Sequence, residues 1–437
     1  MRRVLLVTYF FPPLGGGGVL RPLKLAKYLP AFGWAPHVLT VRDGFWSAMD
    51  ETPLAELGPE VRIHRTRMVM PGRFVKRVLG RGNASSAPGT RGEESVGLAE
   101  RAKSVFRTIA YVPDEFIGWL PFAVREGTRI VKREGIEAVI STSPPHTAHL
   151  VGRAIARRTG LPWVADFRDC WTRNPGFRYG HGLRGWVEAR LERSVLTAAS
   201  RIVTVTEGFR KTFLTDHPFL DPSKIDLIPN GFDPDDYAGG MLPASLQPEE
   251  GRFRVVYTGG FFAHQSPRAF CEALAKLQSE GMQLEALFAG TEQAVVRAEA
   301  QRAGVSGIVR AVGYLASRDA CALQRSADAL LLLMADRAGS EDVCPGKIFQ
   351  YLGAGRPILT MVPEGAAADL VRKTGGGIVV GPRDASSAAR ELLEMVRAKE
   401  AGRPVPGASP EVLIPYTRRE IARRFATLLE EVAPCPS

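Results

Sequence analysis

Short apolar runs alternate with amphipathic segments along most of the chain, and this alternation restricts the folds that the sequence can adopt. The apolar runs are typical of strands buried on both faces, and the amphipathic segments are typical of helices that cover them. The pattern predicts an α/β protein built on parallel sheets. The strands predicted in the first half are 4–8, 36–41, 137–142, 162–167, 201–205 and 224–229.

The alternation is interrupted once, over residues 236–252, which are rich in glycine and proline and have the composition of a linker. The second set of predicted strands is 253–258, 283–289, 308–312, 329–334, 357–361 and 378–380. The sequence therefore predicts two Rossmann-like, doubly wound parallel-sheet domains, 1–240 and 250–410, that face a cleft. We expect a last helical segment, 411–437, to pack back toward the N-terminal domain.

Composition argues against several other classes of protein. The 437 residues contain no run of the roughly 18–20 apolar residues that a membrane-spanning helix needs. The apolar run near the N-terminus is short and leads directly into Pro12-Pro13, so we interpret it as a buried strand and not as a signal peptide. The cysteines are few and scattered, with no CxxC pair, which fits a reducing cytoplasm and argues against a structural zinc site.

The formal net charge of +11 favours an anionic partner. The basic residues are spread along the chain and form no recognised binding module, so we do not expect nucleic acid to be that partner. Residues 66–110 form an insertion whose middle is rich in glycine and serine, and we expect it to be mobile. Within it, residues 67–82 mix basic and apolar side chains, a pattern that fits either a helix on a membrane surface or a solvated loop.

Ligands of open α/β sheets bind at the carboxyl ends of the strands, so the loops that follow the strands are the candidate binding segments. Two prolines and four glycines follow the first predicted strand and open a helix. Because glycine lets backbone N–H groups approach an anion, Gly16, Gly17 and Gly18 are candidates for ligand binding; a tight turn is the alternative. Arg21 stands where a dinucleotide-binding GxGxxG motif needs a small residue, which argues against a nicotinamide-dependent dehydrogenase.

Three charged residues lie at the carboxyl end of the strand predicted at 162–167. Asp166, Arg168 and Asp169 favour a catalytic polar cluster at the floor of the cleft, and a buried ion pair is the alternative. His146 begins a helix after a run of hydroxyl residues, a setting that suits a sugar or an anion.

The second domain offers similar features. Gly259 and Gly260 follow its first strand, and Lys347 lies in the first turn of a helix, where a cation at the positive helix end can meet a diphosphate. Glu364 and Gly365 open a further helix N-terminus at the same edge of the sheet.

Eight motifs, in family order over nearly the whole chain, resemble those of glycosyltransferases of the GT-B fold, specifically the family 4-like group. They are YFFPPLGGGGVLRPLKLAKYLPAFGWAPHVLT, PDEFIGWLPFA, STSPPHTAHLVG, ADFRDCWTRNP, TVTEGF, IPNGFD, VYTGGF and CPGKIFQYLGAGRPIL. The resemblance implies a nucleotide-sugar donor held mainly by the C-terminal domain. It also implies retaining transfer without an essential metal ion, so we expect neither a metal nor another cofactor.

The resemblance also implies roles for single residues. The family's two glutamates, separated by seven residues, correspond to Asp342 and Gln350. By this analogy Asp342 approaches the donor sugar and Gln350 binds the ribose hydroxyls, while Lys347 and Arg268 are candidates for the diphosphate. Many members carry a histidine where this chain has Arg168, so a histidine-based assignment does not transfer.

The acceptor is expected on the N-terminal half, near Arg21, His146 and Trp171. We therefore expect a cytoplasmic glycosyltransferase that moves a sugar from a nucleotide sugar to a cell-surface glycan, lipid-linked or polysaccharide acceptor, at the inner face of the membrane. Two alternatives remain open. One is a sugar-nucleotide epimerase or hydrolase on the same fold. The other is a catalytically inactive protein of this fold that binds a sugar nucleotide, since neither family glutamate is present.

Overall fold

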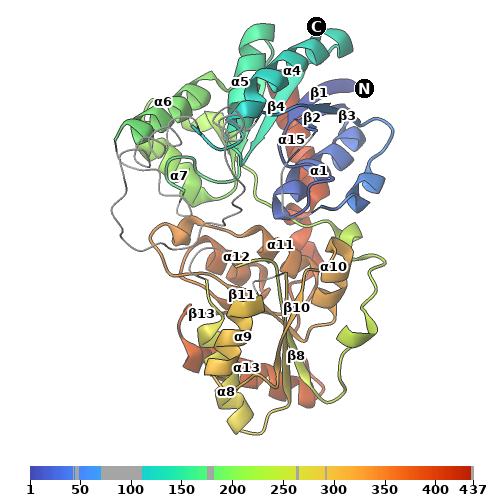
Figure 1. Cartoon of the computed structure of the whole chain (residues 1–437), viewed down its shortest axis with the longest axis vertical. Helices are drawn as coiled ribbons and strands as arrows, with labels where there is room; N and C mark the ends of the chain where they lie inside the picture. Colours follow the sequence, from blue (N-terminus) through green and yellow to red (C-terminus); the bar gives the residue numbers. More distant parts are fainter. Residues whose placement is uncertain are drawn as a thin grey trace, which may run out of the picture.

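The structure is a computed structural model that describes residues 1–42, 44, 49–69, 111–174, 182–261, 265–290 and 293–434. Two α/β domains lie one above the other (Figure 1). This architecture confirms the two Rossmann-like domains predicted from the sequence. The insertion predicted at 66–110, and the membrane segment predicted at 67–82, lie outside the described residues from residue 70 onward.

The N-terminal domain is built on a seven-stranded parallel sheet in the order β3-β2-β1-β4-β5-β6-β7. The chain runs outward from β1 to β3 and returns to the centre at β4, so the switch of direction lies between β1 and β4. The strands are β1 (Arg2–Val7), β2 (Trp34–Val41), β3 (Arg62–Thr66), β4 (Ala138–Ser143), β5 (Trp163–Phe167), β6 (Arg201–Thr204) and β7 (Ile225–Leu227). The described helices around it are α1 (Gly17–Tyr28), α4 (Leu120–Glu134), α5 (Thr147–Thr159), α6 (Leu183–Ala198) and α7 (Glu207–Asp216).

Strand β3 is the one strand of this sheet that the sequence analysis missed. Its sequence is RIHRT, and only Thr66 is buried. The strand pairs with β2 along one edge and has no apolar run of its own. Its place therefore depends on pairing with β2, which a search for apolar runs does not detect.

The C-terminal domain has a six-stranded parallel sheet in the order β10-β9-β8-β11-β12-β13. Its strands are β8 (Phe253–Thr258), β9 (Leu284–Ala289), β10 (Val309–Gly313), β11 (Ala329–Leu333), β12 (Ile358–Met361) and β13 (Gly377–Val380). Its helices are α8 (Arg268–Ser279), α9 (Gln293–Arg302), α10 (Ser317–Arg325), α11 (Gly346–Gly353), α12 (Ala366–Thr374) and α13 (Ala385–Glu400). None of the described helices of the protein is long and apolar enough to span a membrane.

Both faces of the second sheet are covered, which explains its nearly continuous apolar strands. On β8, Val255 and Tyr257 belong to the apolar core on one face, whereas Val256 belongs to the core on the other. Successive side chains of a strand point to opposite faces, so a strand between two cores needs apolar residues at both kinds of position.

The chain crosses between the domains twice, and the two crossings pair with each other. Phe232 N–H donates to the Tyr416 carbonyl at 3.0 Å, and Arg418 N–H donates to the Phe232 carbonyl at 2.7 Å. After α14 (Pro410–Leu413), helix α15 (Arg418–Val432) returns to the N-terminal domain and packs beside α1, as its red colour shows in Figure 1. Its residues Ile421, Phe425 and Leu429 are buried in the N-terminal core.

Candidate active site

The loops at the carboxyl ends of the two sheets touch across the domain boundary. Thr206, which follows β6, donates from Oγ1 to the backbone carbonyl of Asp342 at 2.9 Å, and Asp342 lies in the loop after β11. A Cβ atom added at Gly208 would overlap the Asp342 carboxylate, so only glycine allows this approach. The ligand-binding edges of the two domains therefore face each other.

Lys347 is the most distinctive charge on the C-terminal side of this boundary. It lies in the first turn of α11, and its Nζ donates to the Tyr257 hydroxyl at 2.6 Å and lies 3.3 Å from the Gly260 carbonyl. The ammonium also sits 4.1 Å from the centre of the Tyr257 ring. No described carboxylate forms an ion pair with it, and burial lowers the pKa of Lys347 to about 7. A partly buried cation without a counter-charge at a helix N-terminus is ready to receive an anion.

Three neighbouring strands end in glycines with a left-handed backbone. Gly259, Gly290 and Gly313 have φ values of +101°, +78° and +80° and follow or end β8, β9 and β10. Backbone bonds connect these ends: Gly259 N–H donates to the Ala289 carbonyl at 2.8 Å, and Gly290 N–H donates to the Gly313 carbonyl at 2.6 Å. These three glycines form a rim beside Lys347. Because they lack Cβ atoms, the rim stays open to a ligand.

The substitution Gly259→Ala tests whether this rim borders the donor site. A Cβ at Gly259 would lie 3.2 Å from Lys347 Nζ, and alanine at positive φ costs about 1–2 kcal/mol. We expect the dissociation constant for the nucleotide-sugar donor to rise about tenfold, measured by calorimetric titration. Gly281→Ala is the matched control, because Gly281 has φ +81° but no atom within 4 Å of its added Cβ. Equal donor affinity in both variants would remove Gly259 from the donor site.

Gln350 lies on the same face of α11 as Lys347, because residues three apart in a helix are neighbours. Its side chain is partly exposed and forms no hydrogen bond with a described residue, while its backbone carbonyl accepts from the Tyr237 hydroxyl. The structure thus brings Lys347, Gln350, Gly259 and Gly260 to one end of the C-terminal sheet.

The other residues expected at the donor lie differently. Arg268 is exposed and pairs with Glu272 one turn later on α8, at 3.0 Å. Glu364 is exposed, and its carboxylate accepts from Arg372 at 2.7 Å. Within the described residues, neither contacts Lys347, so the structure does not join them to that cluster. Gly365, at φ +136°, packs against the backbone of Glu341.

The Asp342 carboxylate lies at the contact between the two domains. It is directed at the first turn of α7 in the other domain, and burial and the adjacent Glu341 raise its pKa. A contact between Asp342 and the donor sugar stays a prediction. Asp342 belongs to the contact between the two domains.

Arg168, expected to be catalytic, donates hydrogen bonds to three backbone carbonyls. Its Nε donates to Ser143 at 2.6 Å, Nη1 to Gly18 at 2.8 Å and Nη2 to Pro144 at 3.0 Å. The side chain is buried. It therefore fixes the loops after β1, β4 and β5 relative to one another, and the structure assigns it a positioning role.

Asp166 and Arg21, expected as a catalytic and an acceptor-side residue, form a buried ion pair instead. Arg21 donates to the two Asp166 oxygens at 2.9 and 2.8 Å, and Thr142 donates to the same carboxylate at 2.7 Å. The two side chains are 1% and 0% exposed. A substrate has no access to these groups, so both expectations are corrected. The buried pair that the sequence suggested does exist, but its arginine comes from α1 and not from the neighbouring position.

Asp169 is the carboxylate of this segment that stays partly exposed, and it forms no hydrogen bond with a described residue. Burial by its surroundings raises the pKa of Asp169, while Arg168 lowers it. The glycines at the start of α1 are also accessible: Gly16 and Gly17 are exposed, and a Cβ added at Gly17 meets no atom within 4 Å. Gly18 instead packs on the Phe10 ring.

His146 and Trp171 form a buried stack next to this segment. Their ring centres lie 4.7 Å apart with an angle of 4° between the planes. Burial lowers the pKa of His146 to about 3, so the imidazole is neutral, and its Nδ1 has no partner among the described residues. The Trp171 Nε1 donates to Glu188 at 2.6 Å. Sequence reasoning missed both Glu188 and Tyr257, because their roles depend on partners distant in the chain.

Comparisons with known proteins identify the two domains. Residues 16–231 match the family model of the glycosyl transferase 4-like domain, and residues 252–398 match that of glycosyl transferases group 1. No curated protein gives a significant match.

Solved structures share the fold over the whole chain. A glycosyltransferase from Rickettsia africae has 14% identity and a TM-score of 0.61, with 100% of this chain and 99% of that chain covered. A sucrose-phosphate synthase from Thermosynechococcus elongatus has 15% identity and a TM-score of 0.62, with 99% of each chain covered. HepE from Anabaena, solved in complex with UDP-glucose, has 14% identity and a TM-score of 0.59, with 99% of this chain and 98% of that chain covered. Together, the two domain matches and this shared fold show that the chain belongs to the GT-B glycosyltransferases of the family 4-like group.

Proposed function

We propose that this glycosyltransferase transfers a sugar from a nucleotide-sugar donor to a cell-surface glycan, lipid-linked or polysaccharide acceptor, with retention of the anomeric configuration. The observation that carries the donor proposal is Lys347, a cation without a carboxylate partner at the N-terminus of α11. Uridine is the first base to test, because the similar HepE structure contains UDP-glucose.

The chemistry of the donor explains why a lysine is useful here. Breaking the bond between sugar and diphosphate leaves negative charge on the departing phosphate. The Lys347 ammonium and the N–H groups of the first turn of α11 can stabilise that charge, and the effect is larger in the transition state than in the ground state. This chain's own residues can thereby supply the positive charge that the leaving group requires, and we propose a reaction without an essential metal ion.

A cluster of carboxylates elsewhere does not change this proposal. Glu56, Asp233 and Asp236 come close enough together to hold a cation, but Lys24 already lies among them. Its Nζ is 2.6 Å from Glu56 and 2.8 Å from Asp233, and it also contacts Asp236. We assign these residues to the junction between α1 and the interdomain connection.

Gln350 and Asp169 complete the proposed site. We propose that the Gln350 amide binds ribose hydroxyls beside Lys347, because an amide can both donate to and accept from a hydroxyl. Asp169 lies on the opposite, N-terminal side, and we propose that its partly exposed carboxylate orients an acceptor hydroxyl. The exposed backbone at Gly16 and Gly17 adds N–H donors at the start of α1.

Analysis of the reaction product tests the proposal. The purified protein is incubated with UDP-glucose, other nucleotide sugars and a panel of glycan and lipid-linked acceptors in the presence of EDTA, and the product is identified by NMR. We expect a glycoside with the donor's anomeric configuration. An inverted glycoside would contradict the retaining mechanism, and activity restored only by a divalent cation would contradict metal independence. Release of free sugar or of an epimer would favour the hydrolase or epimerase alternative.

A further inference from the structure

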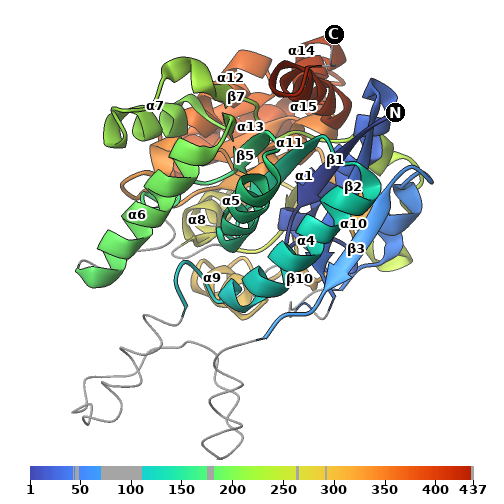
Figure 2. The ribbon, with the colours of Figure 1, turned by 90° about the horizontal axis from the view of Figure 1, so that it is seen from above.

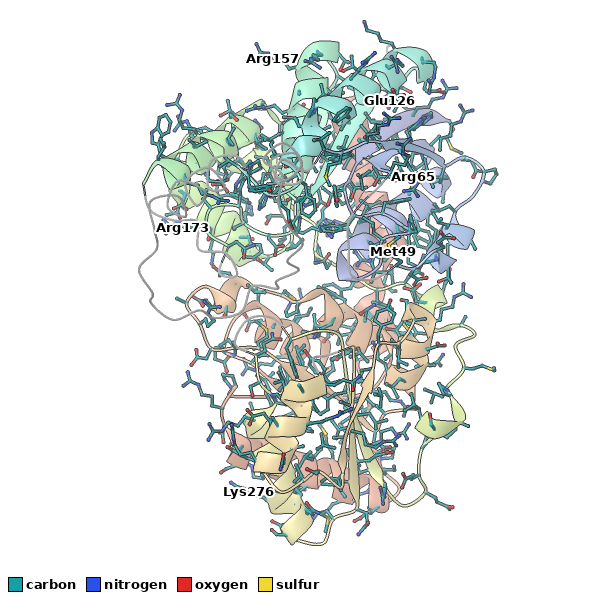
Figure 3. All side chains as sticks on the ribbon, in the orientation of Figure 1. Met49, Arg65, Glu126, Arg157, Arg173 and Lys276 are labelled. Carbon is teal, nitrogen blue, oxygen red and sulfur yellow. The ribbon has the colours of Figure 1, made fainter. Side chains whose placement is uncertain are left out.

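A strongly basic pocket lies between the edge strand β3 and helix α4 of the N-terminal domain. These two elements run side by side in Figure 2, and their residues Arg65 and Glu126 are labelled close to each other in Figure 3. The pocket has a volume of about 400 Å³ and is lined by five arginines but only one carboxylate. The arginines are Arg42, Arg65, Arg67, Arg125 and Arg129, and the carboxylate is Glu126.

Among the lining residues, the single carboxylate forms an ion pair with only one of the arginines. Glu126 pairs with Arg129 at 2.8 Å, within α4. Arg67 and Arg125 are exposed and have no ion pair or hydrogen bond with any described residue. Like charges held this close repel one another, so an anion that binds between them relieves the electrostatic repulsion.

Backbone carbonyls hold Arg65 in place. Its guanidinium donates to the backbone carbonyls of Pro12 and Val41, and not to a carboxylate. These bonds connect β3 to the loop after β1 and to the end of β2. The orientation of Arg65 is therefore fixed before any ligand arrives, which lowers the entropic cost of binding.

The shape and chemistry of the pocket define the ligand. The planar guanidinium group offers paired N–H donors that match the oxygens of a phosphate. The volume exceeds what a bare phosphate needs, and the exposed ring of Phe122 lines the same pocket and offers an apolar contact. We propose that this pocket binds the phosphate of an organic phosphate ester, separately from the nucleotide-sugar site. The ester can be a soluble molecule or the headgroup of an anionic lipid, and the test distinguishes these two sources.

The test uses the full-length protein and the double variant Arg67→Glu/Arg125→Glu. The matched control is Arg157→Glu/Arg158→Glu, which makes the same charge change at exposed positions of α5 on the same domain that do not line the pocket. Calorimetric titration with glycerol 3-phosphate measures the soluble ligand. Co-sedimentation with phosphatidylcholine vesicles, with and without phosphatidylglycerol, measures the lipid headgroup.

We expect the wild type and the control to bind at least one probe. We expect the affinity of the pocket variant for that probe to be lower by at least about tenfold. Binding of glycerol 3-phosphate would identify a soluble ester, and binding only to vesicles with phosphatidylglycerol would identify a lipid headgroup. Equal losses in both double variants would mean that net charge alone acts, and this would overturn the proposal, as would a wild type that binds neither probe. The melting temperature of each variant shows whether a loss of probe binding reflects unfolding. Donor binding, measured in the same variants, shows whether the loss is specific to this pocket and keeps the result independent of the proposed transferase activity.

Discussion

Replacement of Lys347 by alanine is expected to lower kcat about 100- to 1,000-fold, because it removes a cation aimed at the charge that develops on the leaving group. The same change is expected to weaken donor binding. No described carboxylate shares the Lys347 ammonium, so its loss leaves no buried counter-charge behind and the fold should be retained. Steady-state kinetics with the best donor measure the effect, and the melting temperature controls for folding. Unchanged kinetics would remove Lys347 from the phosphate role.

The pH dependence of donor binding gives a second readout for the same residue. Burial lowers the pKa of Lys347 to about 7, so the free protein loses this charge as the pH rises above 7. A bound diphosphate favours the charged form, and binding above that pH must then take up a proton. We expect donor affinity to fall by up to about tenfold per pH unit above 7. In Lys347→Arg the slope should vanish, since the guanidinium stays charged throughout this range.

The second large effect concerns stability. Asp166→Ala leaves the fully buried Arg21 without its counter-charge, a change that costs about 3–5 kcal/mol. Because a folded protein is stable by only about 5–15 kcal/mol, we expect a large fall in the free energy of unfolding, measured by chemical denaturation. A wild-type denaturation midpoint in Asp166→Ala would contradict the structural assignment of this pair.

Two further variants separate structure from catalysis at this segment. The double variant Arg21→Met/Asp166→Leu replaces the ion pair with apolar side chains and should recover much of the lost stability. Asp169→Ala removes a partly exposed carboxylate without a hydrogen-bond partner, so its denaturation midpoint should stay near that of the wild type while its transfer activity falls. If Asp166→Ala lowered only the activity and Asp169→Ala lowered only the stability, the roles of the two residues would be the reverse of those proposed.

The sequence was sufficient to predict the features that follow from local patterns. Buried parallel strands require apolar runs, so the strand pattern predicted two doubly wound domains correctly, except for the polar edge strand β3. The glycine pair at Gly259 and the helix start at Lys347 are also local signals, and the structure brings them together.

The partners of charged side chains could not be predicted in this way. Asp166 pairs with Arg21, which lies 145 residues away in the sequence, and not with its neighbour Arg168. Arg168 instead donates to the carbonyls of Ser143 and Pro144, at the end of β4, and of Gly18, in the first turn of α1. Asp342 faces α7 because the two domains meet there. Such contacts depend on tertiary packing, and a motif shows only that a charge is present.

The central claim is that the C-terminal domain binds a nucleotide sugar through Lys347. A thermal-shift measurement with UDP, GDP, ADP and CMP sugars in EDTA, on the wild type and on Lys347→Ala, tests it most directly. A ligand at about a hundred times its dissociation constant stabilises the folded state by about 2.7 kcal/mol. The account predicts that sugars of one nucleotide raise the melting temperature of the wild type and raise that of Lys347→Ala much less. The absence of a shift with every nucleotide sugar, or an equal shift in both proteins, would contradict it.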